Sequence, residues 1–325
     1  MGHQPEKHMH LLSSARTDKG RVRQNNEDSI DLWEAGQFIL AVVADGMGGA
    51  VAGEEASRIA IETVRERLTD DYHKAPDDYA EDDEDYLLER LVDVIKTANL
   101  NIRERAMKNP ELKGMGTTMT LAFARQSDFS IVHVGDSRAY QVDGHDGSIQ
   151  QLTADHSFVQ ALVDAGHITA EEAENHPMRN VLYRALGQDQ NVDVDTYTDL
   201  RLGIGDRLVL CSDGLTLHVK PQEIADAVMA HPKPADATEK LLALANSRGG
   251  KDNISVIVVL AESTIGTETT EMNVSILKDE TTAIMKPSFQ EDTDTVKIDQ
   301  LSDNDTPPIY NSTYGEGSDT NEPSQ

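Results

Sequence analysis

The chain has 325 residues, of which 58 are acidic and 29 are basic, so its formal net charge is −29. This charge argues against nucleic acid or an anionic membrane surface as a partner, because both require a basic face. The single cysteine allows no internal disulfide, and no apolar run reaches about 18 residues, so we expect a cytoplasmic protein without a membrane insertion.

The apolar pattern predicts strands and helices that do not alternate regularly along the chain. Short runs rich in Val, Ile and Leu, bounded by Gly, Asp or Asn, predict strands over 38–44, 117–123, 129–134, 208–211 and 254–260. Helices are predicted over 54–68, over 87–102, from Pro221 onward and over 235–245. Because strands cluster and helices cluster, the sequence favours an α+β layered fold over a doubly wound sheet.

The composition divides the chain into three parts. Residues 1–12 are expected to be a flexible N-terminus, and residues 13–262 a folded domain. Residues 263–325 contain 13 acidic and 3 basic residues, are rich in Thr and Ser, and are expected to form a disordered tail. Nine carboxylates between residues 70 and 85 predict an exposed connector between the first two helices.

Four aspartates stand at the ends of predicted strands. They are Asp45, Asp136, Asp213 and Asp252, and three of them have a glycine beside them. Carboxylates that converge at one sheet edge repel one another unless a cation is present. Oxygen-only ligands favour Mg²⁺ or Mn²⁺, and a pair of such ions is commonly used for attack on phosphorus.

The segment before the first predicted strand supplies a complementary positive charge. Arg23 lies four residues before Glu27 and five before Asp28. A guanidinium beside carboxylates can hold a phosphate over metal ions, because its planar fork matches two phosphate oxygens.

Seven motifs occur in an order that resembles one known family. They are RTDKGRVRQNNED, VADGMGG, GMGTTMT, VHVGDSRAY, TADHSFVQALVDAGHITAEEAENHPMRNVLYRALG, LCSDGL and KDNISVIVV. Together they cover about residues 14–261 and resemble the metal-dependent Ser/Thr protein phosphatases of type 2C, in their compact bacterial form. The resemblance implies a four-layer αββα sandwich of two antiparallel sheets flanked by helices, with a binuclear metal centre between the sheets.

The resemblance also implies a set of metal ligands and supporting groups. Asp45 would bridge two divalent cations, Mn²⁺ or Mg²⁺, with the Gly46 carbonyl on the second. The remaining assigned ligands are Asp213 and Asp252 on the first ion, Glu27 on the second, and Asp136 with Asp213 on a third, weaker ion. Arg23 would bind phosphate, and Asp28 would orient metal-bound water and Arg23. Asn253 would hold the ligand Asp252 in place without contacting the metal itself.

The chain departs from some relatives at Met47, where DGHGG members place a histidine that is proposed to protonate the leaving oxygen. A methionine cannot transfer a proton, so water or His156 is the alternative acid. Residues 155–186 would form a flap over the site, and Thr169 with Glu172 predicts a capping box within it.

The activity that the resemblance implies is hydrolysis of phosphoserine and phosphothreonine on proteins. Metal-activated water would attack directly, reversing a cognate Ser/Thr protein kinase, and the enzyme is expected to act as a monomer. Two alternatives remain open: a pseudophosphatase that binds phosphoproteins without cleaving them, and a metal-dependent phosphodiesterase acting on a small substrate.

Overall fold

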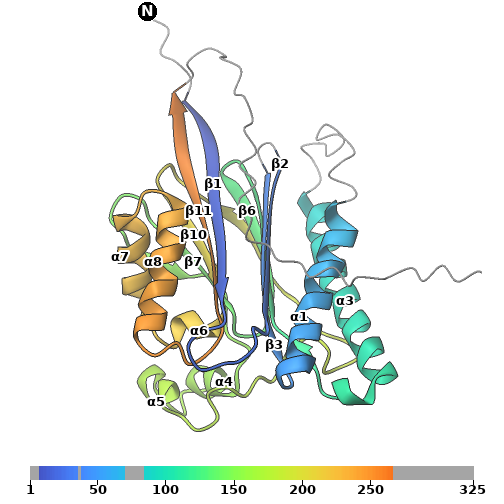
Figure 1. The fold of residues 1–325 in the computed structure, drawn as a ribbon. Helices are drawn as coiled ribbons and strands as arrows, with labels where there is room; N and C mark the ends of the chain where they lie inside the picture. Colours follow the sequence, from blue (N-terminus) through green and yellow to red (C-terminus); the bar gives the residue numbers. More distant parts are fainter. Residues whose placement is uncertain (1–6, 36–37, 70–83, 266–325) are drawn as a thin grey trace, which may run out of the picture. The chain divides into compact units, whose positions relative to one another are not determined.

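The computed structural model describes residues 7–35, 38–69 and 84–265 (Figure 1). Most of the predicted acidic connector and nearly all of the predicted tail lie outside these described residues. Within the described part of the chain, no helix is both long and apolar enough to cross a membrane.

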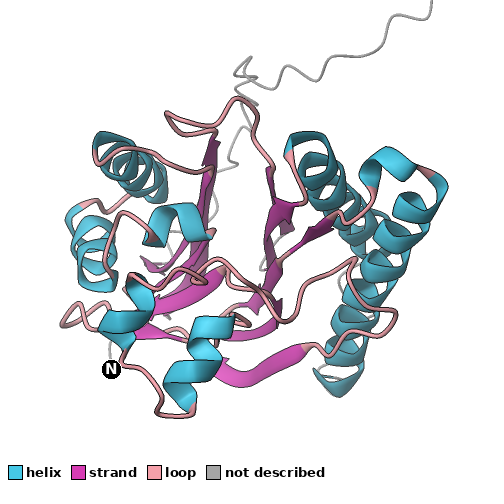
Figure 2. Cartoon of the chain, turned by 90° about the horizontal axis from the view of Figure 1, so that it is seen from below, coloured by secondary structure: helices cyan, strands magenta, loops and turns pink. Residues whose placement is uncertain are grey.

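The described residues form two antiparallel sheets. The first sheet has the order β1 (Lys7–Asp18), β11 (Ile254–Ile265), β10 (Arg207–Cys211), β7 (Arg138–Val142), β8 (Ile149–Gln151). The second has the order β2 (Asp28–Ala35), β3 (Phe38–Met47), β5 (Met119–Arg125), β6 (Asp128–Val134), β9 (Asp195–Arg201), with the short β4 (Gly116–Thr117) paired to β3. The two sheets lie against each other, and helices cover their outer faces (Figure 1), as the view from below also shows (Figure 2).

Side-chain alternation along the strands explains the layers. In β3, Ile39 and Val43 point into the core between the sheets, whereas Leu40 and Val42 point toward the helices. In β10, Leu208 and Leu210 likewise face the core between the sheets. The alternate residues Val209 and Cys211 pack against the helices on the outer face of this sheet. Because both faces of these strands are buried, their sequences are continuous apolar runs, which made them predictable.

The helices occupy the two outer layers and the end of the sandwich near the site. The outer helices are α1 (Ala50–Val64) with its π-helical continuation η1 (Arg65–Thr69), α3 (Glu84–Lys108), α7 (Pro221–Ala230) and α8 (Pro234–Ser247). The shorter ones are η3 (Pro110–Leu112), α4 (Phe158–Asp164), α5 (Ala170–Glu174) and α6 (Asp213–Thr216). All four predicted helices are present, and the fold confirms the predicted αββα sandwich.

The boundaries of the folded domain differ from the prediction at both ends. β1 begins at Lys7, so residues 7–12 belong to a sheet rather than to a flexible terminus. β11 continues through Ile265, three residues past the predicted boundary at 262. The reason is mutual pairing, because Lys7 lies opposite Ile265 and the two strands stay in register over twelve residue pairs.

Candidate active site

One cavity of about 230 Å³ lies where the ends of both sheets meet. Most of the residues that the sequence analysis singled out line it: Arg23, Glu27, Asp45, Gly46, Asp136, Asp213, Asp252 and Asn253. Residues that were given no role also line it: Gly48, Gly49, Thr118, Asn180 and Leu182, together with Met47. Asp28 and His156 are not among the lining residues.

Strand pairing positions the acidic residues on the β2–β3 side of the cavity. Asp28 lies directly opposite Asp45 in the β2–β3 register. The next residue along β3, Gly46, accepts close approach because a Cβ there would collide with the backbone of Gly53 in α1. The peptide of Gly46 is also bonded to the previous loop, its N–H donating to the Glu27 carbonyl at 3.1 Å. The glycine therefore lets helix α1 and the carboxylate-bearing loop close on each other.

Arg23 is held between two carboxylates at the mouth of the cavity. Its Nη2 donates to Asp252 Oδ2 at 2.9 Å, and its Nη1 lies 3.5 Å from Glu27 Oε1. The Arg23 side chain remains 45% exposed, so its guanidinium is accessible from solvent. Among the described residues, the Arg23 guanidinium contacts Asp252 and Glu27, whereas the expected role of Asp28 toward water and Arg23 stays a prediction.

Asp28 instead makes its contacts across to the first sheet. Its Oδ2 accepts hydrogen bonds from Ser212 and Ser255, each at 2.7 Å. Its Oδ1 is buried and accepts no hydrogen bond from any residue that the structure describes. Burial raises the Asp28 pKa to about 7, and the two serine hydroxyls oppose that rise.

The electrostatics of the cavity are dominated by carboxylates close to one another. Burial and, to a lesser extent, the nearby Asp252 carboxylate raise the pKa of Asp213 to about 6. Burial also raises the pKa of Asp45 and of Asp136 well above the usual range, with additional repulsion from Asp28 on Asp45 and from Asp213 on Asp136. The cluster therefore lacks the positive charge that would let all its members ionise.

The donor set fits divalent cations. All side-chain donors are carboxylate oxygens, which suit Mg²⁺ and Mn²⁺, and a cation would relieve the repulsion that raises their pKa values. The buried Oδ1 of Asp28 is a further carboxylate oxygen, and it accepts no hydrogen bond from the described residues. Among the described residues, no three acidic or histidine side chains already stand as a ready-made ligand group, so the carboxylates would rotate to enclose an ion.

Asn253 ties the loop before β2 to the segment before β11. Its Oδ1 accepts from the Glu27 N–H at 2.8 Å, and its Nδ2 donates to the carbonyls of Lys19 and Asn25 at 3.0 and 2.9 Å. Asn253 is only 3% exposed. Its backbone N–H also donates to Asp252 Oδ1 at 2.9 Å, so Asn253 contacts both Glu27 and Asp252.

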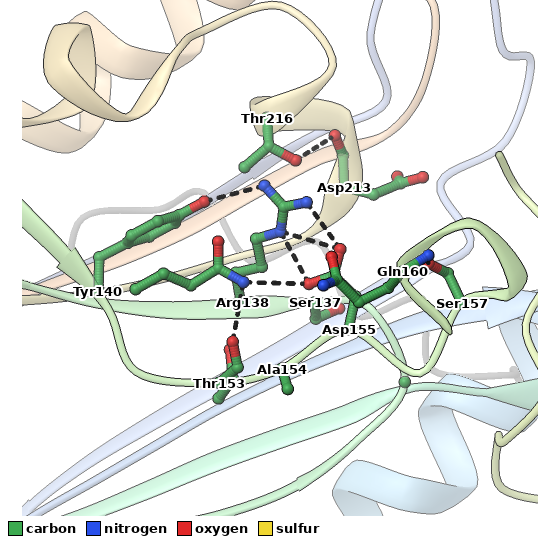
Figure 3. A network of polar contacts seen from close by, with 12 residues as sticks. Ser137, Arg138, Tyr140, Thr153, Ala154, Asp155, Ser157, Gln160, Asp213 and Thr216 are labelled. Atoms are coloured by element: carbon green, nitrogen blue, oxygen red, sulfur yellow. Dashed lines mark hydrogen bonds and ion pairs between the residues drawn. The ribbon is translucent and has the colours of Figure 1, made fainter. Parts of the chain in front are cut away.

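The segment 155–186, which the resemblance predicts to form a flap, contains α4 and α5. Within it, the capping box predicted at Thr169 is confirmed, since Thr169 Oγ1 accepts from the Glu172 N–H and the Glu172 carboxylate accepts from the Thr169 N–H. At its start, Asp155 receives a forked hydrogen bond from Arg138, whose third nitrogen donates to Tyr140 Oη at 3.1 Å (Figure 3).

The assignment of His156 as a proton donor is corrected by its surroundings. His156 is 1% exposed and lies outside the cavity lining. Its Nδ1 accepts from the Gly135 N–H at 3.0 Å, and its Nε2 faces Asp195 Oδ2 at 3.1 Å. Burial lowers the His156 pKa. The ring fastens the flap to Gly135, because both nitrogens are directed at protein groups rather than at the cavity.

The missed cavity residues carried weaker signals. Thr118 lies in the GMGTTMT motif, and Asn180 and Leu182 lie in the long motif that covers residues 153–187. None of these three residue types indicates a definite chemistry by itself. Their role depends on neighbours that are distant in sequence, such as Asp45 and Ser137 around Thr118. Only the order of the motifs could have indicated them.

The sandwich and its carboxylate-lined cavity define a class of phosphatase. The family model described as "Protein phosphatase 2C" matches residues 17–254, and the chain belongs to this family. The match includes every residue assigned to the candidate site.

Named relatives and a solved structure agree with this membership. The chain is 40% identical to the serine/threonine protein phosphatase PstP of Mycobacterium tuberculosis over 248 residues, covering 76% of this chain and 44% of PstP. It is 39% identical to the serine/threonine phosphatase stp of Listeria monocytogenes over 247 residues, covering 75% of this chain and 93% of stp. The chain therefore spans less than half of PstP but nearly all of stp.

The solved structure is the PstP catalytic domain in complex with two manganese ions. It superposes with a TM-score of 0.64 at 36% sequence identity, and the match covers 78% of this chain and 99% of that domain. The similarity thus includes nearly the whole of that catalytic domain.

Proposed function

We propose that this chain hydrolyses phosphoserine and phosphothreonine monoesters on proteins, and that the reaction depends on divalent cations. One observation carries the proposal: Arg23 and a group of mutually repelling carboxylates line a single cavity of about 230 Å³. The manganese complex of the PstP catalytic domain supports the metal requirement.

The acidic residues would hold the cations. Asp45, the Gly46 carbonyl, Asp213, Asp252 and Glu27 would hold two ions, and Asp136 with Asp213 would hold a third, weaker one. When bound, the cations lower the pKa of water so that hydroxide is available near neutral pH, and they polarise the phosphoryl oxygens. Manganese has the support of the related structure, and magnesium is the alternative with the same ligand preference.

Arg23 would bind and orient the phosphate group. Asp252 and Glu27 hold its guanidinium at the mouth of the cavity, while the guanidinium keeps further N–H donors for two phosphate oxygens. Asn253 fixes the Glu27 backbone and so keeps the loop that carries Arg23 in place. The substrate phosphorus would therefore be oriented by groups from both sheets.

The leaving oxygen would receive its proton from solvent. Met47 lines the cavity but has no proton to transfer, and the nitrogens of His156 are directed at Gly135 and Asp195. Because the Arg23 side chain that lines the cavity is 45% exposed, water can reach the leaving oxygen from the solvent. General-acid catalysis by a side chain is thus replaced by protonation from water.

We also propose the setting in which this reaction takes place. The substrates would be phosphorylated proteins, with a cognate Ser/Thr kinase performing the opposite reaction, and the enzyme would work as a cytoplasmic monomer. The acidic surface favours target sites flanked by basic residues. Light scattering checks the monomer, for which a mass of 35.6 kDa is expected.

A phosphate-release assay tests the central proposal. The full chain is incubated with a phosphothreonine peptide in Mn²⁺, in Mg²⁺ or in EDTA, beside an Asp213→Asn variant purified identically. Hydrolysis by the wild type with Mn²⁺, abolished by EDTA and by the variant, is expected. Peptide binding without hydrolysis would favour the pseudophosphatase. The phosphodiester bis(p-nitrophenyl) phosphate is assayed in parallel, and hydrolysis of this substrate alone would favour the phosphodiesterase.

A further inference from the structure

Thr118 lies between a strand end and a turn that each carry an acidic residue of the cavity. Asp45 stands near the end of β3, and Asp136 stands in the turn between β6 and β7. Thr118, between β4 and β5, is 1% exposed and lines the same cavity. Its hydroxyl makes hydrogen-bond contacts both with the end of β3 and with the turn between β6 and β7.

On one side, Thr118 holds the backbone of Asp45. The Asp45 N–H donates to Thr118 Oγ1 at 3.0 Å, and the Thr118 N–H donates to the Asp45 carbonyl at 2.9 Å. Thr117 Oγ1 donates to the same carbonyl at 2.9 Å. Both polar groups of the Asp45 peptide backbone are therefore fixed, which limits how the Asp45 carboxylate can be displaced.

On the other side, Thr118 contacts the residues that flank Asp136. Thr118 Oγ1 lies 2.7 Å from Ser137 Oγ, and Ser137 is fully buried. Because Thr118 Oγ1 accepts from the Asp45 N–H, its own hydrogen is available to donate to Ser137. The methyl group packs against Gly135, where a Cβ would lie 2.5 Å from Thr118 Cγ2.

The far end of the same turn is anchored independently. Arg138, which follows Ser137, forms its fork with Asp155, with Nε–Oδ1 at 2.9 Å and Nη2–Oδ2 at 2.7 Å (Figure 3). The turn is also held at Ser137, whose carbonyl accepts from Thr120 Oγ1 at 3.1 Å, and at Gly135, whose N–H donates to His156 Nδ1. Thr118 adds the hydrogen bonds that join this turn to Asp45. Threonine supplies both a hydroxyl and a methyl at this point, whereas serine lacks the methyl and valine lacks the hydroxyl.

We propose that Thr118 is a positioning residue that sets the separation of Asp45 and Asp136 and thereby tunes divalent-cation affinity. The Asp45–Thr118–Ser137 chain of hydrogen bonds transmits the position of the β3 end to the turn between β6 and β7. This role rests on the proposed function, because Asp45 and Asp136 are the ligands assigned there.

Direct Mn²⁺ binding tests the role of the Thr118 hydroxyl. Free Mn²⁺ is measured by electron paramagnetic resonance during titration of the full chain, and phosphate release is followed in parallel. Thr118→Val should weaken Mn²⁺ binding by about tenfold or more, as loss of groups that orient metal ligands usually does. Thr118→Ser, which keeps the hydroxyl, should restore most of the affinity.

Thr238→Val is the matched control. Thr238 in α8 is also fully buried and also uses its hydroxyl, contacting Ser14 Oγ at 3.1 Å and the Ala235 carbonyl at 3.0 Å, but it does not line the cavity. Its substitution should lower the melting temperature and leave Mn²⁺ affinity unchanged. Thr118→Val binding Mn²⁺ as tightly as the control would overturn the proposal.

A second variant covers the case in which Thr118→Val does not fold. Ser137→Ala removes the same hydrogen bond from its other end and should weaken Mn²⁺ binding in the same direction; wild-type affinity in that variant would contradict the role. The wild type separates the two proposals: Mn²⁺-dependent hydrolysis by the wild type upholds the proposed function even where the Thr118 role fails.

Discussion

The guanidinium of Arg23 donates to the carboxylate of Asp252, with Nη2 and Oδ2 2.9 Å apart although 229 residues separate them in sequence. The contact joins the loop before the first strand of one sheet to the segment before the last strand of the other. It thus fixes the position of the one cationic side chain that lines the cavity in the described structure.

Arg23→Lys should raise the KM for a phosphothreonine peptide about tenfold and change kcat less, because an ammonium cannot bind two phosphate oxygens as a fork. Steady-state kinetics at saturating Mn²⁺ measure both constants. Arg21→Lys, two residues away and outside the cavity lining, is the control and should leave both unchanged. An unchanged KM in Arg23→Lys would remove Arg23 from substrate binding.

Asp213→Asn should abolish activity and yet stabilise the metal-free protein. Burial and Asp252 raise the Asp213 pKa to about 6 in the fold, so between its ordinary value and about 6 the folded state binds the extra proton. Stability therefore falls as pH rises through this window, and the loss persists at pH 7. Replacing the charge should recover about 1–3 kcal/mol, measured by urea unfolding in EDTA. A less stable variant at pH 7 would show that repulsion is not the dominant effect.

Gly53→Ala should destabilise the domain, although alanine usually stabilises a helix interior by about 1 kcal/mol relative to glycine. A Cβ at this position in α1 would collide with the Glu27 carboxylate and would lie 2.9 Å from the Gly46 carbonyl oxygen. Both groups are assigned to the second metal ion, so activity should fall together with the urea midpoint. A variant at least as stable and active as the wild type would refute the close packing.

Asn253→Ala should lower the free energy of unfolding by about 2–3 kcal/mol, because it leaves one buried N–H and two carbonyls without their partner. Urea denaturation measures the change. Asn101→Ala is the comparison, since its Nδ2 makes a single bond to Thr63 Oγ1 at 3.0 Å on a less buried surface. Equal losses in the two variants would contradict the bridging role of Asn253.

The stability of the wild type should fall as pH drops below about 6.5, partly through His133. Burial lowers the His133 pKa to about 3, so between that value and its ordinary one the unfolded chain binds a proton that the fold excludes. Stability contributed by neutral His133 is present above pH 6.5 and is lost as pH falls. Between pH 7.5 and 5.0 the wild type should lose about 2 kcal/mol more than His133→Asn. Parallel pH profiles for the two proteins would be inconsistent with this assignment.

The strands that the sequence predicted are those buried on both faces. β3, β5, β6, β10 and β11 appear as continuous apolar runs, and their existence follows from composition alone. β9 alternates partly buried and exposed residues, and β1 and β2 mix polar with apolar residues, so their patterns do not separate strand from loop. Pairing with partners distant in sequence decides their structure.

The candidate site was predictable to the extent that its residues lie at or beside the ends of strands. Asp45, Asp213 and Asp252 occupy one cavity because strand ends converge there. His156 was assigned incorrectly because the direction of its ring is set by Asp195 and by the Gly135 N–H, neither of which the local sequence reveals. Thr118 was missed for the same reason, since its hydroxyl has a role only beside Asp45 and Ser137.

The pairing of β1 with β11 has a consequence for biosynthesis. The first strand of the domain finds its partner only when residue 265 has left the ribosome, since Lys7 pairs with Ile265. All strands of the other sheet lie between residues 28 and 201 and can pair earlier. During translation, the sheet that contains β2, β3, β5, β6 and β9 can assemble while β1 is still unpaired. An unpaired strand edge makes a nascent chain vulnerable to aggregation, so chaperone binding is useful in this period.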